Sequence, residues 1–314
     1  LYHRRMKLLL YPRLLCLALF CLPGGASGHI FPMPPSNTDL VGEIVVIEAR
    51  EEDTLVDIAR RERIGQDAIV LANPEVDRWY PGEGARVVIP SRFILPSVPR
   101  RGLVLNTPEM RLYYFSESNL DDAPRVEVYP VAIGRQGWET PVTETTLISK
   151  QRDPAWYPPE SIRKEHAAAG DPLPRVVPPG PDHPLGRHAL RLGLPGYLIH
   201  GTNKAFGVGM RVSHGCVRML PEDVESLFER IPVGAPVQII NQPVKVGWDA
   251  DTLYLEVHPP LEEDEVNRER LADTVWQLID QAVGDRFLVL NEASIRAEIK
   301  RPSGVPREIS ESLF

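Results

Sequence analysis

Apolar and polar positions in the first third of the chain outline a small unit of two strands and two helices. The apolar run 44–48 predicts a short strand, and Asp53 with Thr54 favours the start of an amphipathic helix. A second helix is predicted over 66–71 and a second strand over 86–90. This strand–helix–helix–strand order occupies about fifty residues, which is too few for an enzyme with a deep site.

The stretch 98–241, after an apparent linker at 95–99, is rich in predicted strands joined by short connections. The strands are expected at 102–106, 110–115, 126–133, 196–200 and 237–240, and Pro221 opens a helix. This pattern favours a β-rich sandwich or barrel over alternating strand–helix units.

Residues 154–187 interrupt the β-rich pattern. Nine prolines lie between 154 and 184, so that no regular strand or long helix fits most of this stretch. A connection this long inside a compact domain is usually a functional lid or a disordered segment. Because Trp156, Tyr157 and Ile162 give it apolar side chains to bury, we expect an ordered lid with one short helix at 161–167.

The remaining residues, 242–314, alternate strand and helix patterns and contain no motif that indicates a function. Strands are predicted at 252–257 and 287–290, and helices over 262–282 and 292–300. The whole chain is therefore expected to be mainly β with α. A small module precedes a sandwich-like or barrel-like domain, and an α+β tail follows it.

Residues 1–28 have the layout of a secretory signal peptide. Four basic residues and no acid accompany the apolar run 14–22, and small residues follow at 24–28. We expect cleavage near 26–28 and export of the remaining chain. An uncleaved membrane anchor is the alternative, although the apolar run is short for a bilayer span.

Composition narrows the classes of function. The 314 residues suggest about two domains, and 43% hydrophobic residues exclude disorder along the whole chain. A formal net charge of -8 argues against a general nucleic-acid binder. Cleavage of the signal peptide would remove Cys16 and Cys21 and leave Cys216 as a thiol with no intramolecular partner.

Cys216 is the strongest candidate for chemistry. It lies in a glycine-containing turn just before a helix start, a position that favours the reactive thiolate. His200 and His214 are candidate bases, and Gly215 would let backbone N–H groups of the turn approach a developing oxyanion. A zinc site is the alternative, but it would have three ligands at an unusual spacing. Surface or satisfied core positions are expected for the other histidines that we considered, namely His29, His166, His183, His188 and His258.

These residues form a recognisable signature. His200-Gly201-Thr202, a Gly-rich loop, and then Ser213-His214-Gly215-Cys216-Val217-Arg218-Met219 resemble the signature of the L,D-transpeptidase (YkuD) family, and the resemblance extends over about 98–241. Arg218 stands where many members of that family have Asn. We associate arginine at this position with envelope enzymes of Gram-negative bacteria.

The resemblance implies a role for each matching residue. Cys216 would be the nucleophile that forms a thioester, and His200 the general base, oriented by the Gly201 carbonyl. The oxyanion hole would be lined by His214, Gly215 and Cys216. The remaining two residues would belong to the substrate-binding site. Ser213 would support the loop there, and Arg218 would pair with a substrate carboxylate.

Residues 42–92 resemble a LysM module, a type of domain that binds glycans containing N-acetylglucosamine. The resemblance rests on 53–59, Asn73-Pro74, 81–84 and 88–90. A packing module that has lost its ligand is the alternative.

Together the two resemblances imply a periplasmic L,D-transpeptidase of peptidoglycan stem peptides that needs no metal or organic cofactor. Its acyl acceptor would be the diaminopimelate amine of a second stem, giving a 3-3 cross-link, or a lysine of an envelope lipoprotein. An L,D-carboxypeptidase that uses the same acyl-enzyme is the alternative within enzymes. A non-catalytic peptidoglycan-binding protein is the alternative outside them.

Overall fold

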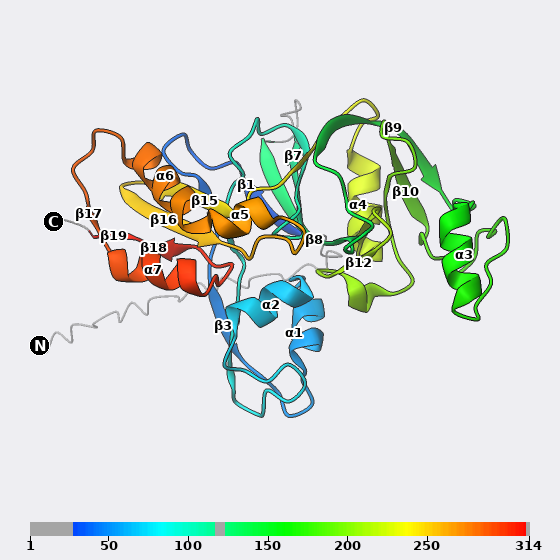
Figure 1. The fold of residues 1–314 in the computed structure, drawn as a ribbon, viewed down its shortest axis with the longest axis horizontal. Coiled ribbons are helices and arrows are strands. Elements are labelled where there is room, and N and C mark those ends of the chain that lie inside the picture. Colours follow the sequence, from blue (N-terminus) through cyan, green and yellow to red (C-terminus); the bar gives the residue numbers. More distant parts are fainter. Residues whose placement is uncertain (1–27, 117–122, 312–314) are drawn as a thin grey trace, which may run out of the picture.

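The structure, a computed structural model, describes residues 28–116 and 123–311 (Figure 1). The predicted signal peptide, 1–28, lies outside the described residues except for Gly28. Among the described helices, none combines the length and the apolar character that a bilayer crossing would need.

A closed ring of strands forms the centre of the molecule. Around it the strands run β8-β13-β11-β10-β9-β14-β6-β7, and β7 pairs again with β8. The ring consists of β6 (Gly102–Asn106), β7 (Arg111–Ser116), β8 (Arg125–Gly134), β9 (Thr143–Arg152), β10 (His188–Leu192), β11 (Leu198–His200), β13 (Val217–Met219) and β14 (Pro236–Ile240). Two further strands, β1 (His29–Pro32) and β12 (Arg211–Ser213), pair with β8. The expectation of a mainly β, barrel-like domain is therefore confirmed.

Helix α4 (Pro221–Arg230) packs against the apolar interior of this barrel. Its residues Val224, Leu227 and Phe228 join the buried side chains of the strands in one core. Proline at its first position and acidic residues in its first turn suit a helix start, as the sequence predicted.

In the barrel, sequence reasoning missed strands β1, β9, β10, β12 and β13. In β9 only Leu147 is buried, so most of its side chains face solvent and give no apolar alternation. Strand β1 ends at Pro32, at the start of a proline-rich stretch, yet it pairs in register with β8. Tertiary pairing outweighs weak local preference in these strands.

The small module has the predicted order of elements. Strands β3 (Val45–Glu48) and β4 (Arg86–Ile89) pair antiparallel around helices α1 (Leu55–Arg61) and α2 (Gln66–Ala72). Thr54 caps α1 through a capping box with Asp57, which explains why that helix starts where the sequence predicted.

The module is fixed to the barrel and does not hang from a free linker. Strands β2 (Leu40–Gly42) and β5 (Arg92–Ile94) pair with each other. In the expected linker, 95–99, Leu95 is buried, and its N–H donates to the Asp39 carbonyl at 2.8 Å. The expected linker is an irregular connection between β5 and β6 (Gly102–Asn106), and its apolar side chains pack into the core beside β2.

Helix α2 begins against the loop that joins β11 to β12. Its N-cap, Gly65, has no side chain to cap the helix, and carbonyl groups of the loop accept the free N–H groups instead. The Gln66 N–H donates to the Val208 carbonyl at 3.4 Å, and the Asp67 N–H donates to the Gly209 carbonyl at 3.1 Å. The barrel thus supplies the cap for a helix of the small module.

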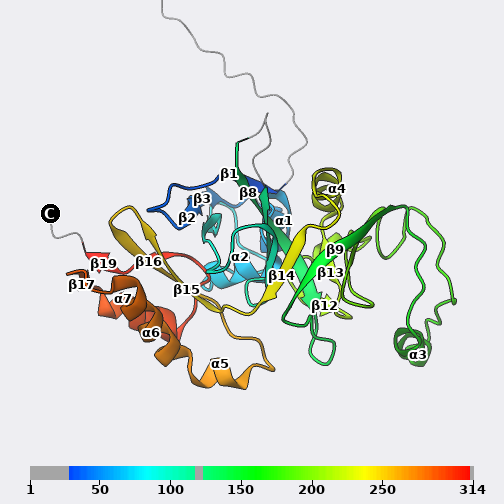
Figure 2. The ribbon, with the colours of Figure 1, turned by 90° about the horizontal axis from the view of Figure 1, so that it is seen from above.

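The tail forms a separate layer beside the barrel (Figure 2). Strands β15 (Val244–Asp249), β16 (Thr252–Val257) and β18 (Arg307–Glu308) form one sheet, with a core shared by α6 (Leu271–Val283) and α7 (Glu292–Lys300). The predicted helix over 262–282 is divided into α5 (Glu265–Glu269) and α6. The predicted strand at 287–290 shortens to β17 (Val289–Leu290), which pairs with β19 (Ser310–Glu311).

Candidate active site

A cavity of about 540 Å³ lies against strands β9, β10 and β11, next to the predicted signature. Its walls come from β9 and β10, from β11, from the turn at 213–216 and from the segment 154–187. Five of the seven predicted site residues line it, namely Ser213, His214, Cys216, His200 and Arg218. The remaining two, Gly201 and Gly215, are buried and reach the site through their backbone atoms.

The pairing of two short strands brings Cys216 and His200 to the same place. Strands β11 and β13 run parallel, with His200 opposite Arg218, so that Cys216 lies just before the point where the strands meet. His200 is only 3% exposed, and its Nδ1 donates to the Gly201 carbonyl at 2.6 Å. This bond leaves Nε2 as the ring nitrogen that can accept a proton.

Burial keeps both groups neutral at rest. It raises the pKa of the Cys216 thiol, although the Leu198 N–H and the charge of Arg218 partly offset this effect. Burial, together with the nearby charge of Arg218, lowers the pKa of His200 to about 3. The site therefore holds a thiol and an uncharged imidazole, so that attack by sulfur requires removal of its proton.

The turn that carries Cys216 is held by hydroxyl groups on two sides. Ser213 Oγ accepts the Gly215 N–H at 3.1 Å and donates to the Cys216 carbonyl at 2.5 Å. Thr140 Oγ1 donates to the Gly215 carbonyl at 2.8 Å and accepts the Gly134 N–H at 2.9 Å. Sequence reasoning missed Thr140, since nothing in its local pattern marks it.

Glycine is required at position 215 of this turn. Its φ is +99°, a backbone conformation that side chains with a Cβ rarely adopt. An added Cβ would lie 2.9 Å from Cε1 of Tyr197, which lines the cavity. The turn can therefore keep its N–H groups close to the cavity only with glycine here.

His214 contacts residues that the sequence did not predict. Its ring meets Trp138 edge-on at 4.8 Å between centroids, and its Nε2 lies 3.2 Å from Glu165 Oε2. Arg135 lies beside both, with Nη2 2.6 Å from Glu165 Oε1. Glu165 belongs to α3 (Glu160–Ala168), the helix inside 154–187.

Arg218 has an unsatisfied side chain in the cavity wall. It is half-buried, and its Nε has no hydrogen-bond partner within residues 28–116 and 123–311. Burial lowers the pKa of its guanidinium, because the charged form loses hydration there. A guanidinium with an unsatisfied Nε in a cavity wall is suited to receive a carboxylate from outside the chain.

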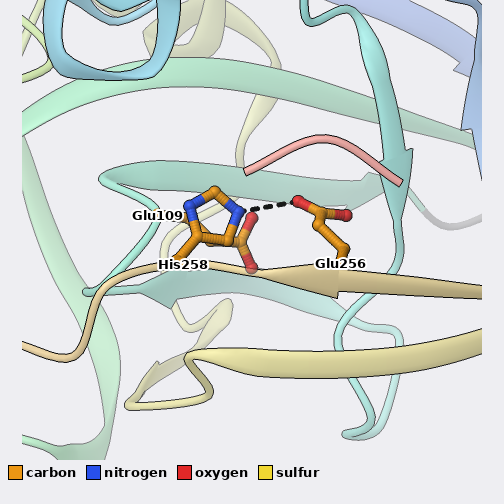
Figure 3. A group of neighbouring side chains, drawn as sticks. All are labelled: Glu109, Glu256 and His258. Atoms are coloured by element: carbon orange, nitrogen blue, oxygen red, sulfur yellow. Dashed lines mark hydrogen bonds and ion pairs between the residues drawn. The ribbon is translucent and has the colours of Figure 1, made fainter. Parts of the chain in front are cut away.

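The one metal-like group of ligands within the described residues lies away from this cavity. Glu109, Glu256 and His258 bring ligand atoms within 4.8 Å of one another (Figure 3). Lys245 Nζ already lies 2.9 Å from Glu109 Oε1 and 3.1 Å from Glu256 Oε2, and Arg111 pairs with both carboxylates. This group is therefore an internal ion cluster between barrel and tail. His258 is buried and hydrogen-bonded to Glu256, as expected of a satisfied core histidine.

Comparison with known proteins identifies the family to which this sequence is similar. Residues 100–239 match the model of the L,D-transpeptidase catalytic domain. The chain is 41% identical over 292 residues to the probable L,D-transpeptidase YbiS of Escherichia coli, covering 90% of this chain and 92% of that protein. It is 39% identical to the probable L,D-transpeptidase ErfK/SrfK of Salmonella typhimurium, over 89% of this chain and 91% of that protein.

Solved structures of other L,D-transpeptidases are less similar to this chain than these sequence relatives are. L,D-transpeptidase 3 from Mycobacterium tuberculosis is 20% identical, with a TM-score of 0.33 over 50% of this chain and 67% of that chain. The sequence relatives at about 40% identity, which align along most of the chain, carry the assignment. This chain belongs to the L,D-transpeptidase family.

Proposed function

We propose that the chain is an exported, periplasmic L,D-transpeptidase that acts on the stem peptides of peptidoglycan. The observation that carries the proposal is that Cys216 and His200 line one cavity, where burial favours the neutral thiol and the neutral imidazole, next to the turn at 213–216. The donor would be a tetrapeptide stem. Cys216 attacks the carbonyl of its third residue, meso-diaminopimelate, and the terminal D-alanine leaves.

The neutral pair determines the order of proton transfers. His200 Nε2 takes the thiol proton as Sγ bonds to the carbonyl carbon, while Nδ1 stays bonded to the Gly201 carbonyl. Because the Gly215 N–H already donates to Ser213 Oγ, the tetrahedral oxyanion would be stabilised by the other N–H groups of the turn, those of His214 and Cys216. When the bond to D-alanine breaks, His200 returns the proton to the leaving amine and a thioester remains.

The second half of the reaction transfers the acyl group to an amine. His200 accepts a proton from the incoming amine, the new amide bond forms, and the Cys216 thiol is regenerated. The acceptor would be the diaminopimelate amine of another stem, giving a 3-3 cross-link, or a lysine of an envelope lipoprotein. The wall formed by 154–187 would restrict water and thereby favour aminolysis over hydrolysis.

Arg218 and the small module supply binding. The guanidinium of Arg218, whose Nε lacks a partner among the described residues, would pair with a stem-peptide carboxylate. In the module, Trp79 and Tyr80 are 57% and 85% exposed, and Asp77 accepts both of their backbone N–H groups. Exposed rings held by a fixed turn are suited to stack on sugars, which supports glycan binding by this LysM-like unit.

The test is incubation of the mature protein with a disaccharide-tetrapeptide, followed by mass spectrometry. We expect a cross-linked dimer with loss of D-alanine, and no product from Cys216→Ala. Tripeptide alone, converted to an adduct when a lysine peptide is added, would identify a lipoprotein-type acceptor. If tripeptide is the sole product with every amine tested, the chain is a hydrolase. Equal behaviour of wild type and Cys216→Ala would overturn the proposal.

A further inference from the structure

Helix α3 contacts the catalytic turn through one side chain, Glu165. The segment 154–187 projects from β9 and β10 at one end of the molecule and carries α3 near its outer limit (Figure 1). From there Glu165 lies 3.2 Å from His214 Nε2 and 2.6 Å from Arg135 Nη2. Arg135 also donates its backbone N–H to the Ser213 carbonyl at 3.1 Å. Glu165 is therefore bonded to the turn both directly and through Arg135.

The geometry selects one tautomer of His214. A carboxylate only accepts, so the ring nitrogen that faces Glu165 must carry the proton. The Arg135 guanidinium also only donates, and although its Nη2 lies 3.3 Å from the same nitrogen, it is satisfied by Glu165. Glu165 thereby fixes the orientation of the ring, while the edge of Trp138 supports it from a second side.

Charge reinforces this contact. Three charged groups face the ring: Glu165 from α3, Arg135 after β8 and Arg218 from β13. Burial is the largest influence and lowers the pKa of His214, the two arginines lower it further, and Glu165 alone raises it. Loss of the Glu165 carboxylate would therefore leave a more weakly basic imidazole among positive charges.

The ion pair itself adds little to the stability of the fold. The side chains of Glu165 and Arg135 are 39% and 40% exposed, and pairs with such exposure contribute little to folding. The same helix carries a second exposed pair, Glu160 with Lys164, which does not reach the turn. The two glutamates thus differ in what they contact, which makes Glu160 a matched control.

We propose that Glu165 is a positioning residue that fastens the segment 154–187 to the catalytic turn and so controls which nucleophile reaches the acyl-enzyme. Trp156 and Ile162 of this segment line the cavity, so that release of α3 would loosen that wall and admit water. The inference rests on the proposed transferase function for its effect on products. The contact between Glu165 and His214 does not depend on that function.

The experiment compares Glu165→Gln with Glu165→Asp and the control Glu160→Gln. Nuclear magnetic resonance of ¹⁵N-histidine-labelled protein would follow the titration of His214. We expect a lower pKa of His214 in Glu165→Gln, because the negative charge that favours the protonated ring is gone. Glu165→Asp should restore part of the shift, and Glu160→Gln should titrate like wild type. If the pKa of His214 is the same in Glu165→Gln as in wild type, the proposed contact between Glu165 and His214 is refuted.

A second readout measures products from tetrapeptide with a fixed amine acceptor. In Glu165→Gln we expect the ratio of transfer product to tripeptide to fall by about threefold or more relative to Glu160→Gln, independently of any change in the rate of D-alanine release. If the ratio of transfer product to tripeptide is the same in Glu165→Gln and Glu160→Gln, then Glu165 does not determine which nucleophile reacts with the acyl-enzyme. Absence of D-alanine release from wild type would instead refute the proposed function, and the His214 titration would still decide the contact.

Discussion

Thr140 provides a sharp test of how the catalytic turn is held. Its hydroxyl joins two backbone groups that are far apart in sequence, the Gly215 carbonyl at 2.8 Å and the Gly134 N–H at 2.9 Å, and its side chain is buried. Thr140→Val keeps the shape of the side chain and removes both bonds. The variant therefore isolates the hydrogen bonds from packing.

The expected cost follows from the two partners left without a bond. A buried backbone group that loses its partner costs about 1–3 kcal/mol, so the loss of two partners should lower the free energy of unfolding by about 2–6 kcal/mol. The carbonyl of Gly215 is then free to shift, and the N–H groups of the turn shift with it. A displacement of reacting groups by about 1 Å costs on the order of 100-fold in kcat. KM should change little, since Arg218 and the cavity walls remain.

The assay combines urea unfolding with the steady-state rate of D-alanine release. Thr140→Ser retains the hydroxyl and should recover most of the rate. The control is Thr146→Val, at an exposed position of β9, which should match wild type in both measurements. If Thr140→Val loses stability but keeps kcat within about twofold of wild type, the turn does not hold the oxyanion and the reasoning is wrong.

Three further predictions concern the rest of the molecule. Lys245→Met should lower the free energy of unfolding in urea by about 3–5 kcal/mol, because Glu109 and Glu256 would lose a buried countercharge. Burial alone would raise the pKa of both glutamates, but the Lys245 charge and the other nearby cations outweigh it and lower both. Their contribution to stability should therefore be complete at neutral pH and decline as pH falls below about 4.3, the unfolded pKa, which acid titration of the melting temperature would reveal. Gly209→Ala should destabilise the docked small module by about 2 kcal/mol or more in thermal unfolding, since φ is +84° and an added Cβ would lie 2.2 Å from backbone across the interface. Gly137 has a φ of +80° but open surroundings, so Gly137→Ala measures only the loss of stability that comes from the backbone conformation, without a steric clash.

The residues of the signature could be predicted because neighbouring positions in the sequence remain neighbours in the site. Cys216, His214 and Ser213 share one turn, and a single parallel pairing of short strands adds His200. Thr140 gave no such signal, because it reaches the turn from 75 residues away in the sequence. Local patterns do not report contacts of this kind, and Glu165 and Arg135 were missed for the same reason.

The fold was predictable where one face of an element is buried and the other is not. Helix α4 shows this pattern, with its apolar stripe against the barrel core. Strand β9 does not, since its side chains are mostly exposed and only pairing with β10 and β14 holds it in the sheet. The linker at 95–99 has the irregular backbone that its prolines suggested, but the sequence did not reveal that Leu95 is part of a core.

The accessory parts of the molecule converge on the stretch between His200 and Cys216. The small module caps its helix α2 on carbonyls at 208 and 209 of that stretch, and Gln66 Nε2 donates to the Phe206 carbonyl. From the other side α3 reaches His214, two residues before the cysteine. Both contacts therefore act on the loop that sets the spacing between the imidazole and the thiol. A loop held from two sides loses less entropy when substrate binds, so the module and the helix would contribute to positioning as well as to binding.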